Sequence, residues 1–152
     1  MKRQLLIVPD ERLRQQAKPI ERIDESVRSL ATFLLSQVEP TESIGLAATQ
    51  YGEMVRLIVI RLQGIERVII NPEIVKRQGE HSVEESCRSI PKLHFELQRP
   101  RVVKVRGLDP DGNPVSLKGH DTLAQCICHE VDHLDGILLD TIGKVIETEV
   151  NS

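Results

Sequence analysis

The chain contains almost no aromatic residues, few cysteines and no long hydrophobic run. Aromatic residues make up 2% of its 152 residues, so it has no surface on which nucleic-acid bases could stack. No apolar run approaches the ~20 residues that cross a membrane, and the N-terminal apolar stretch is too short for a signal peptide. The three cysteines are an odd number, typical of free thiols or metal ligands in a reducing compartment. We therefore expect a cytoplasmic protein with no membrane partner.

The remaining composition is that of an ordinary globular domain. Hydrophobic residues make up 39% and charged residues 28% of the chain, and the net charge of -3 provides no basic surface for a nucleic acid. The length suits one domain with one core, and the sequence contains no repeat and no linker-like stretch. We predict that residues 1–152 form a single domain.

Hydrophobic periodicity in the first half predicts a helix followed by a hairpin. Residues 23–40 place apolar side chains at helical intervals, and Asp24 is suited to cap the N-terminus. Two short β-branched runs, 55–61 and 66–72, flank Gly64 and predict two antiparallel strands.

The second half predicts another strand pair and then a buried helix. Residues 102–119 predict two strands around the turn at 109–112. Residues 121–136 have apolar residues spread along their whole length and predict a mostly buried helix, with Asp121 as the expected cap and Gly136 as the stop. This order of elements indicates an α+β fold in which antiparallel sheets pack around a central helix.

The predicted second helix carries a metal-hydrolase motif within the stretch CHEVDHLDG, residues 128–136. His129 and His133 are four positions apart, so both can direct a ring nitrogen at one ion. Glu130 lies beside them and can take a proton from a water whose pKa the metal lowers. Two surface histidines are the alternative, but the neighbours are apolar, and burying two unpaired imidazoles is costly.

A catalytic metal site usually has three protein ligands. No histidine follows His133, and the only later glutamates, Glu147 and Glu149, lie in a polar tail. Cys87 is the better candidate, because it is embedded in the polar segment VEESCRSIP, where a cysteine that merely fills a core would not be expected.

The other two cysteines are expected to belong to the core. Cys126 and Cys128 are two positions apart on a helix and so face nearly opposite directions, which prevents both from joining His129 at one ion. Cys126 lies about one turn before Glu130, from where it could line the wall of a pocket.

Three stretches together resemble the signature motifs of the peptide deformylase family: SIGLAATQ at 43–50, ESCRS at 85–89 and HEVDH at 129–133. Residues 8–20 and 103–119 are also similar, so the resemblance covers nearly the whole chain. The family removes formyl groups from the N-terminal methionine of new proteins. The resemblance implies one divalent ion, Fe²⁺ first, with Zn²⁺, Ni²⁺ or Co²⁺ as alternatives in purified protein. It also implies its ligands: Cys87, His129 and His133.

The resemblance further implies how the remaining site residues act. Glu130 would be the general acid and base, while Gln50 and the backbone N–H of Arg88 would hold the formyl oxygen as it gains negative charge. Glu85 and Arg99 would form a supporting ion pair. The substrate-binding residues would be Ile44, Gly45, Ser86, His94, Gln125 and Cys126.

Several residues depart from the family pattern. The family usually has glycine at Ser43 and Ser86, leucine at Arg88, an apolar residue at Gln125 and often arginine at His94. We expect the Arg88 side chain to bring a cation near the substrate groove, and the Gln125 amide to weaken binding of a thioether unless it points away.

Three functions remain open on the sequence alone. The first is deformylation of N-formylmethionyl peptides. The second is a related deformylase acting on another formylated amine, such as a lysine side chain, which the departures at Arg88 and Gln125 motivate. The third is a non-catalytic metal-binding relative, against which the retained Glu130 argues. The short, slightly acidic tail TIGKVIETEVNS lacks the basic helix implicated in ribosome docking by longer members, so we expect no such docking.

Overall fold

The computed structural model describes residues 3–38, 44–62 and 64–148. Ser43 lies outside these ranges. No helix within them is long and apolar enough to cross a membrane. The elements follow the order η1 (Glu11–Arg14), α1 (Glu25–Gln37), β1 (Gly45–Ala47), η2 (Ala48–Tyr51), β2 (Leu57–Leu62), β3 (Ile65–Cys87), β4 (Ile90–Leu108), β5 (Pro114–His120), α2 (Thr122–Leu134), α3 (Leu139–Ile142) and β6 (Lys144–Thr148).

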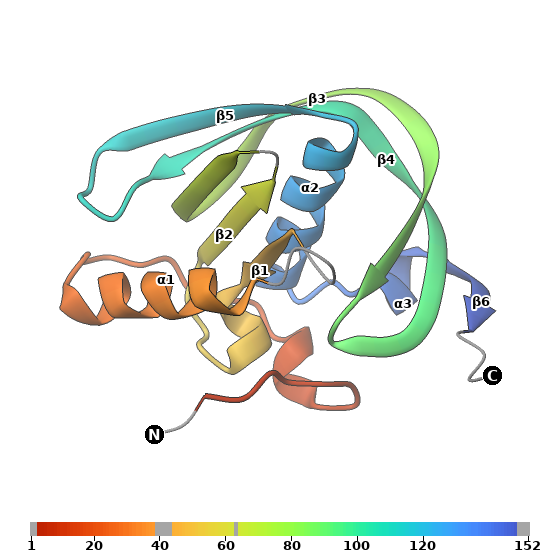
Figure 1. Cartoon of the computed structure of the whole chain (residues 1–152), viewed down its shortest axis with the longest axis horizontal. Coiled ribbons are helices and arrows are strands. Elements are labelled where there is room, and N and C mark those ends of the chain that lie inside the picture. Colours follow the sequence, from red (N-terminus) through yellow and green to blue (C-terminus); the bar gives the residue numbers. More distant parts are fainter. Residues whose placement is uncertain (1–2, 39–43, 63, 149–152) are drawn as a thin grey trace.

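The described strands form one antiparallel sheet around α2. The strand order is β1-β2-β3-β4-β5, and β6 pairs with the first part of β4, at residues 93–96. Figure 1 shows β3 and β4 as a long ribbon that passes α2 and then bends down toward α3 and β6. Side chains of α2 and of the sheet share a core that includes Ile58, Val103, Val105, Ile127 and Leu134. The predicted α+β class, with a helix packed on antiparallel strands, is confirmed.

The predicted first helix and both strand pairs are present. Asp24 caps α1 by accepting a hydrogen bond from the backbone N–H of Val27 at 3.2 Å. Gly64 lies between β2 and β3 with a φ of 82°, a conformation that favours glycine. Asp109 organises the β4–β5 turn, since its Oδ1 accepts from the N–H groups of Asp111 and Asn113 at 2.9 Å.

The predicted second helix is α2, but the expected cap is wrong in detail. Asp121 stands at the N-cap position with a φ of 50°, yet its side chain makes no capping hydrogen bond. Its carboxylate instead faces Arg101 at 3.9 Å. The expected stop is confirmed, because Gly136 follows the helix with a φ of 73° and lies against the backbone of Arg14, where a Cβ would not fit.

Candidate active site

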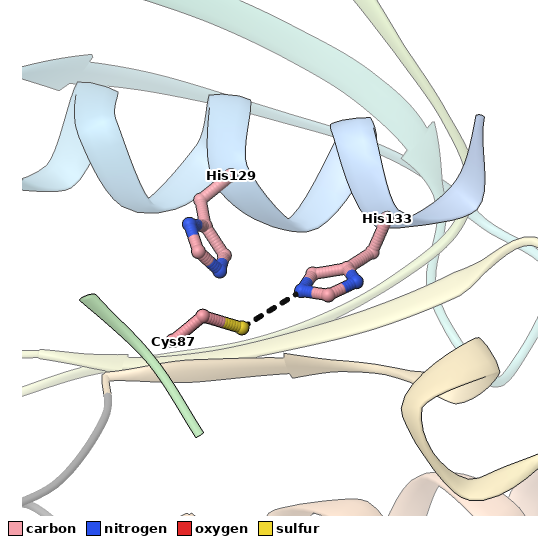
Figure 2. A group of neighbouring side chains, drawn as sticks. All are labelled: Cys87, His129 and His133. Atoms are coloured by element: carbon pink, nitrogen blue, oxygen red, sulfur yellow. Dashed lines mark hydrogen bonds between the residues drawn. The ribbon is translucent and has the colours of Figure 1, made fainter. Parts of the chain in front are cut away.

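Three side chains able to bind a metal meet between the end of β3 and the second half of α2. Cys87 is the last residue of β3, while His129 and His133 lie one turn apart on α2. One donor atom from each residue lies within 4.8 Å of the others, and the Cys87 Sγ is 3.3 Å from the His133 Nε2. Figure 2 shows both imidazoles directed from the helix toward the sulfur. The structure therefore brings together the three residues that the sequence singled out as ligands.

The orientation of His129 is fixed by a buried ion pair. Its Nδ1 lies 3.1 Å from the Glu85 Oε1, which leaves Nε2 as the nitrogen able to bind an ion. Arg99 donates to both oxygens of Glu85 at 2.8 and 3.0 Å, which confirms the predicted pair. Burial would raise the pKa of Glu85, but hydrogen bonds from His129 and Arg99 outweigh it and lower the pKa to about 2. Arg99 also binds Asp132 at 2.7 Å, a partner that sequence reasoning missed.

His133 is held in the neutral form that a metal requires. It is 2% exposed, and burial lowers its pKa well below the usual value. Its Nε2 faces Cys87, whereas its Nδ1 is buried without a hydrogen-bond partner among the described residues. One thiol and two oriented imidazoles form a donor set that fits a divalent ion such as zinc or iron(II).

Glu130 directly follows His129 on α2 and lies beside the same group of side chains. Its side chain lines a cavity of about 310 Å³ together with Cys87 and His129. The residue is 4% exposed, and burial raises the pKa of Glu130 to about 7. Its Oε1 is buried with no hydrogen-bond partner in the described part of the chain. A carboxylate in this environment can both accept and return a proton near neutral pH.

Gln50 presents a fixed amide to the cavity from η2. Its Oε1 accepts a hydrogen bond from the backbone N–H of Ala47 at 2.9 Å, which leaves the NH₂ group on the other side. That NH₂ donates to the Ser89 hydroxyl at 3.3 Å, and Gln50 lines the cavity. Because the amide has two N–H bonds, one remains for a further acceptor. Ser89 was not predicted, since nothing in its local sequence links it to Gln50.

Most of the expected substrate-binding residues line this cavity. The residues that do so are Ile44, Gly45, Ser86, Gln125 and Cys126, joined by Leu46 and Thr122, which sequence reasoning missed. His94 is not among the lining residues, because it lies in β4 opposite Glu147 of β6. Cys126 and Cys128 are both buried, as expected, and Cys126 also forms part of the wall.

Two of the departures from the family pattern have a clear structural outcome. The Gln125 NH₂ group points toward β3, where it lies 3.4 Å from the Glu85 Oε2 and 3.5 Å from the Glu84 carbonyl oxygen. Arg88 lines the cavity, but its Nη1 donates to the Gln37 carbonyl oxygen at the end of α1, at 2.9 Å. Both polar groups are thus bound by the protein itself.

The close approach of β1 to α2 makes Gly45 a sensitive position. A Cβ at Gly45 would lie 2.8 Å from both the Cys126 Sγ and the Val59 carbonyl oxygen, and 3.2 Å from the Glu130 Cγ. We expect Gly45→Ala to cost about 1–3 kcal/mol of stability, the usual effect of overpacking, and to lower activity by displacing Glu130. Urea unfolding and a turnover assay measure the two effects. Adding Cys126→Ala should relieve only part of the loss, since the Val59 carbonyl remains; full recovery would contradict this account.

An oriented set of three metal ligands beside a buried glutamate and an amide donor defines a metal-dependent hydrolase. The sequence pattern of the polypeptide deformylase family matches residues 2–145. The chain therefore belongs to the polypeptide deformylase family, metal-dependent enzymes that remove the N-formyl group from new peptides.

Individual relatives agree with this assignment. Peptide deformylase 2 of Clostridium acetobutylicum is 40% identical over 147 residues, which cover 95% of this chain and 98% of that protein. Peptide deformylase of Mesorhizobium japonicum is 43% identical over 148 residues, covering 93% and 84%. The crystal structure of a peptide deformylase from Legionella pneumophila superposes with a TM-score of 0.88 at 40% identity, covering 93% of this chain and 86% of that one. A Synechococcus elongatus peptide deformylase in complex with actinonin also has a TM-score of 0.88, at 37% identity, with 93% and 79% covered.

Proposed function

We propose that this protein hydrolyses the formamide of N-formylmethionyl peptides and releases formate. The observation that supports it most directly is that the buried Glu130 carboxylate lines the same cavity as Cys87 and His129, while His133 lies beside the Cys87 sulfur. A purely structural metal site needs no such carboxylate and favours four closed ligands, so the geometry argues against a non-catalytic relative.

In this proposal Cys87, His129 and His133 hold one divalent ion, and iron(II) is our choice of native metal. When bound, the ion supplies Lewis-acid polarisation and makes water a stronger acid. Glu85 and Arg99 keep the His129 ring in the required orientation. Carboxylate partners of this kind tune ligand strength in metal sites.

Glu130 moves the proton. It takes the proton from the water that attacks the formyl carbon and then delivers it to the leaving amine nitrogen. Its pKa of about 7, raised by burial, suits both halves of this transfer. The free N–H of the Gln50 amide and the backbone N–H of Arg88 stabilise the negative oxygen that develops between the two transfers.

Part of the cavity wall suits a methionine side chain. Ile44, Leu46 and Cys126 provide apolar surface for a thioether. The Gln125 amide is drawn toward Glu85 and Glu84, so its methylene stem is left to face the substrate. This placement removes the main objection to methionine that the sequence raised. Neither a nucleic acid nor a membrane takes part in the proposed reaction, and we place it in the cytoplasm, where the three free thiols stay reduced.

The test is formate release by metal-loaded protein from two peptides of equal sequence. One carries formyl on its N-terminal methionine, and the other carries formyl only on an internal lysine side chain. We expect faster turnover of the first and loss of activity after removal of the metal by a chelator. Iron-loaded protein should also lose activity in air faster than nickel-loaded protein, because thiolates at redox metals oxidise. Faster turnover of the lysine peptide would identify formyl-lysine, and not formylmethionine, as the substrate. No turnover of either peptide by the metal-loaded protein would contradict the proposal.

A further inference from the structure

The two walls of the cavity come from parts of the chain that share no strand ladder. One wall is β1 with the preceding Ile44, and the other is the end of β3 at residues 86–88. In the described sheet β1 pairs only with β2, and the other edge of β2 pairs with the first part of β3, residues 65–70. Backbone hydrogen bonds between strands therefore do not fix the distance between the walls.

The Arg88 side chain reaches from the second wall to α1, the helix whose Leu34 shares a core cluster with Leu46 of β1. Its Nη1 donates to the Gln37 carbonyl oxygen at 2.9 Å, at the C-terminus of the helix that precedes β1. The last turn of α1 contains no basic residue of its own, so Arg88 supplies the cation that the negative end of a helix favours. Burial raises the pKa of Tyr51, and the neighbouring Arg88 guanidinium opposes that rise, which also places Arg88 beside η2.

Ser89, the residue after Arg88, is also held by hydrogen bonds to other parts of the chain. The Ser89 hydroxyl accepts from the Gln50 amide at 3.3 Å, and the Ser89 carbonyl accepts from the N–H of Val8 at 2.9 Å. The turn between β3 and β4 is thus tied to α1, η2 and the N-terminal segment. The β3–β4 turn carries the Arg88 N–H, and η2 carries the Gln50 amide. The spacing of these two proposed oxyanion donors therefore depends on the hydrogen bonds that hold the turn against η2 and α1.

We propose that Arg88 is a positioning residue whose guanidinium clamps the two walls of the cavity and thereby sets the spacing of the Arg88 N–H and the Gln50 amide. The catalytic part of this inference rests on the proposed function. The clamp itself is a property of the fold. A leucine or methionine at this position could pack in the cavity but could not bind the carbonyl at the end of α1.

The test compares Arg88→Met, which keeps length but loses every donor, with Arg88→Lys, which keeps a cation and its donors. Arg28→Met is the matched control, because Arg28 is an exposed arginine of α1 whose ion pair, among the described residues, is a local one with Glu25 at 3.3 Å. Amide hydrogen exchange in metal-free protein reports on the walls without any need for activity. We expect Arg88→Met to exchange about tenfold faster at residues 44–47 and 86–90, the scale of one lost charge-assisted hydrogen bond, while β2 stays unchanged.

The kinetic arm uses metal-loaded protein and the formylmethionyl peptide. Arg88→Met should lower kcat/KM about tenfold, through both a higher KM and a lower kcat. Arg88→Lys should recover much of this loss. Arg28→Met should have the same kinetic constants as the unchanged protein. Unchanged exchange at both walls, or equally faster exchange throughout the sheet, would overturn the clamp. If Arg88→Met does not fold, Arg88→Gln, which is neutral and shorter, takes its place in the comparison, and unchanged exchange at both walls would again overturn the clamp. Faster wall exchange in a protein whose unchanged form releases no formate would leave the clamp standing and remove the proposed function.

Discussion

Glu130→Gln is expected to yield a folded, metal-loaded protein whose turnover is lower by about 100- to 10,000-fold, the range that general acid–base catalysis supplies. The substitution keeps the shape of the side chain, which is 4% exposed and faces the cavity. It removes the only group at this position that can accept a proton. Metal analysis and formate release, measured on the same preparation, check the two halves of the prediction.

Glu84→Gln is the control for loss of a nearby negative charge. Glu84 is exposed, and it precedes Glu85 on β3. We expect this variant to retain activity within about twofold, as surface substitutions usually change little. Near-normal turnover by Glu130→Gln with a full complement of metal would assign the proton transfer to another group.

Arg99→Met is expected to lower the free energy of unfolding by about 3–5 kcal/mol, because it strands a buried carboxylate. The Arg99 and Glu85 side chains are 6% and 7% exposed, and Arg99 also binds Asp132. Its loss leaves two carboxylates near His129 without their cation. Urea unfolding of metal-free protein measures the effect, and a fall of this size is a large share of the stability of a typical domain.

Two comparisons separate this buried pair from ordinary ion pairs. Arg106→Met breaks the pair with Glu73, whose side chains are 63% and 64% exposed, and should cost less than about 1 kcal/mol. Adding Glu85→Gln to Arg99→Met removes the stranded charge and should restore part of the lost stability. An Arg99→Met protein as stable as Arg106→Met would show that Glu85 tolerates isolation.

The sequence predicted the grouping of Cys87, His129 and His133 better than it predicted the sheet. His129, Glu130 and His133 follow from helical spacing alone, and Cys87 was recognised because its flanks are polar. The length of β3 and β4 could not be predicted in the same way. Most residues at 75–82 are exposed on both faces, so that part of β3 lacks the alternation of apolar and polar residues by which a half-buried strand is recognised.

Contacts between distant parts of the chain account for the remaining differences. The direction of the Arg88 side chain depends on a carbonyl oxygen 51 positions away, and the Gln50 amide depends on a hydroxyl 39 positions away. Neither partner has a local signature. The same reason explains Asp132, whose contact with Arg99 spans 33 positions. The expected cap at Asp121 failed because the chain turns with a positive φ there, which directs the carboxylate away from the helix N-terminus.

The proposed ligands Cys87 and His133 are 46 positions apart, on a strand and a helix that meet only in the native structure. An unfolded chain therefore has no preassembled set of donors, and an ion that binds here selects the native state. Such an ion adds about 4 kcal/mol when its free concentration is a thousand times its dissociation constant. For this protein, the supply of metal in the cell and the survival of the polypeptide against proteolysis are thereby linked, and a shortage of the ion would lower abundance as well as activity.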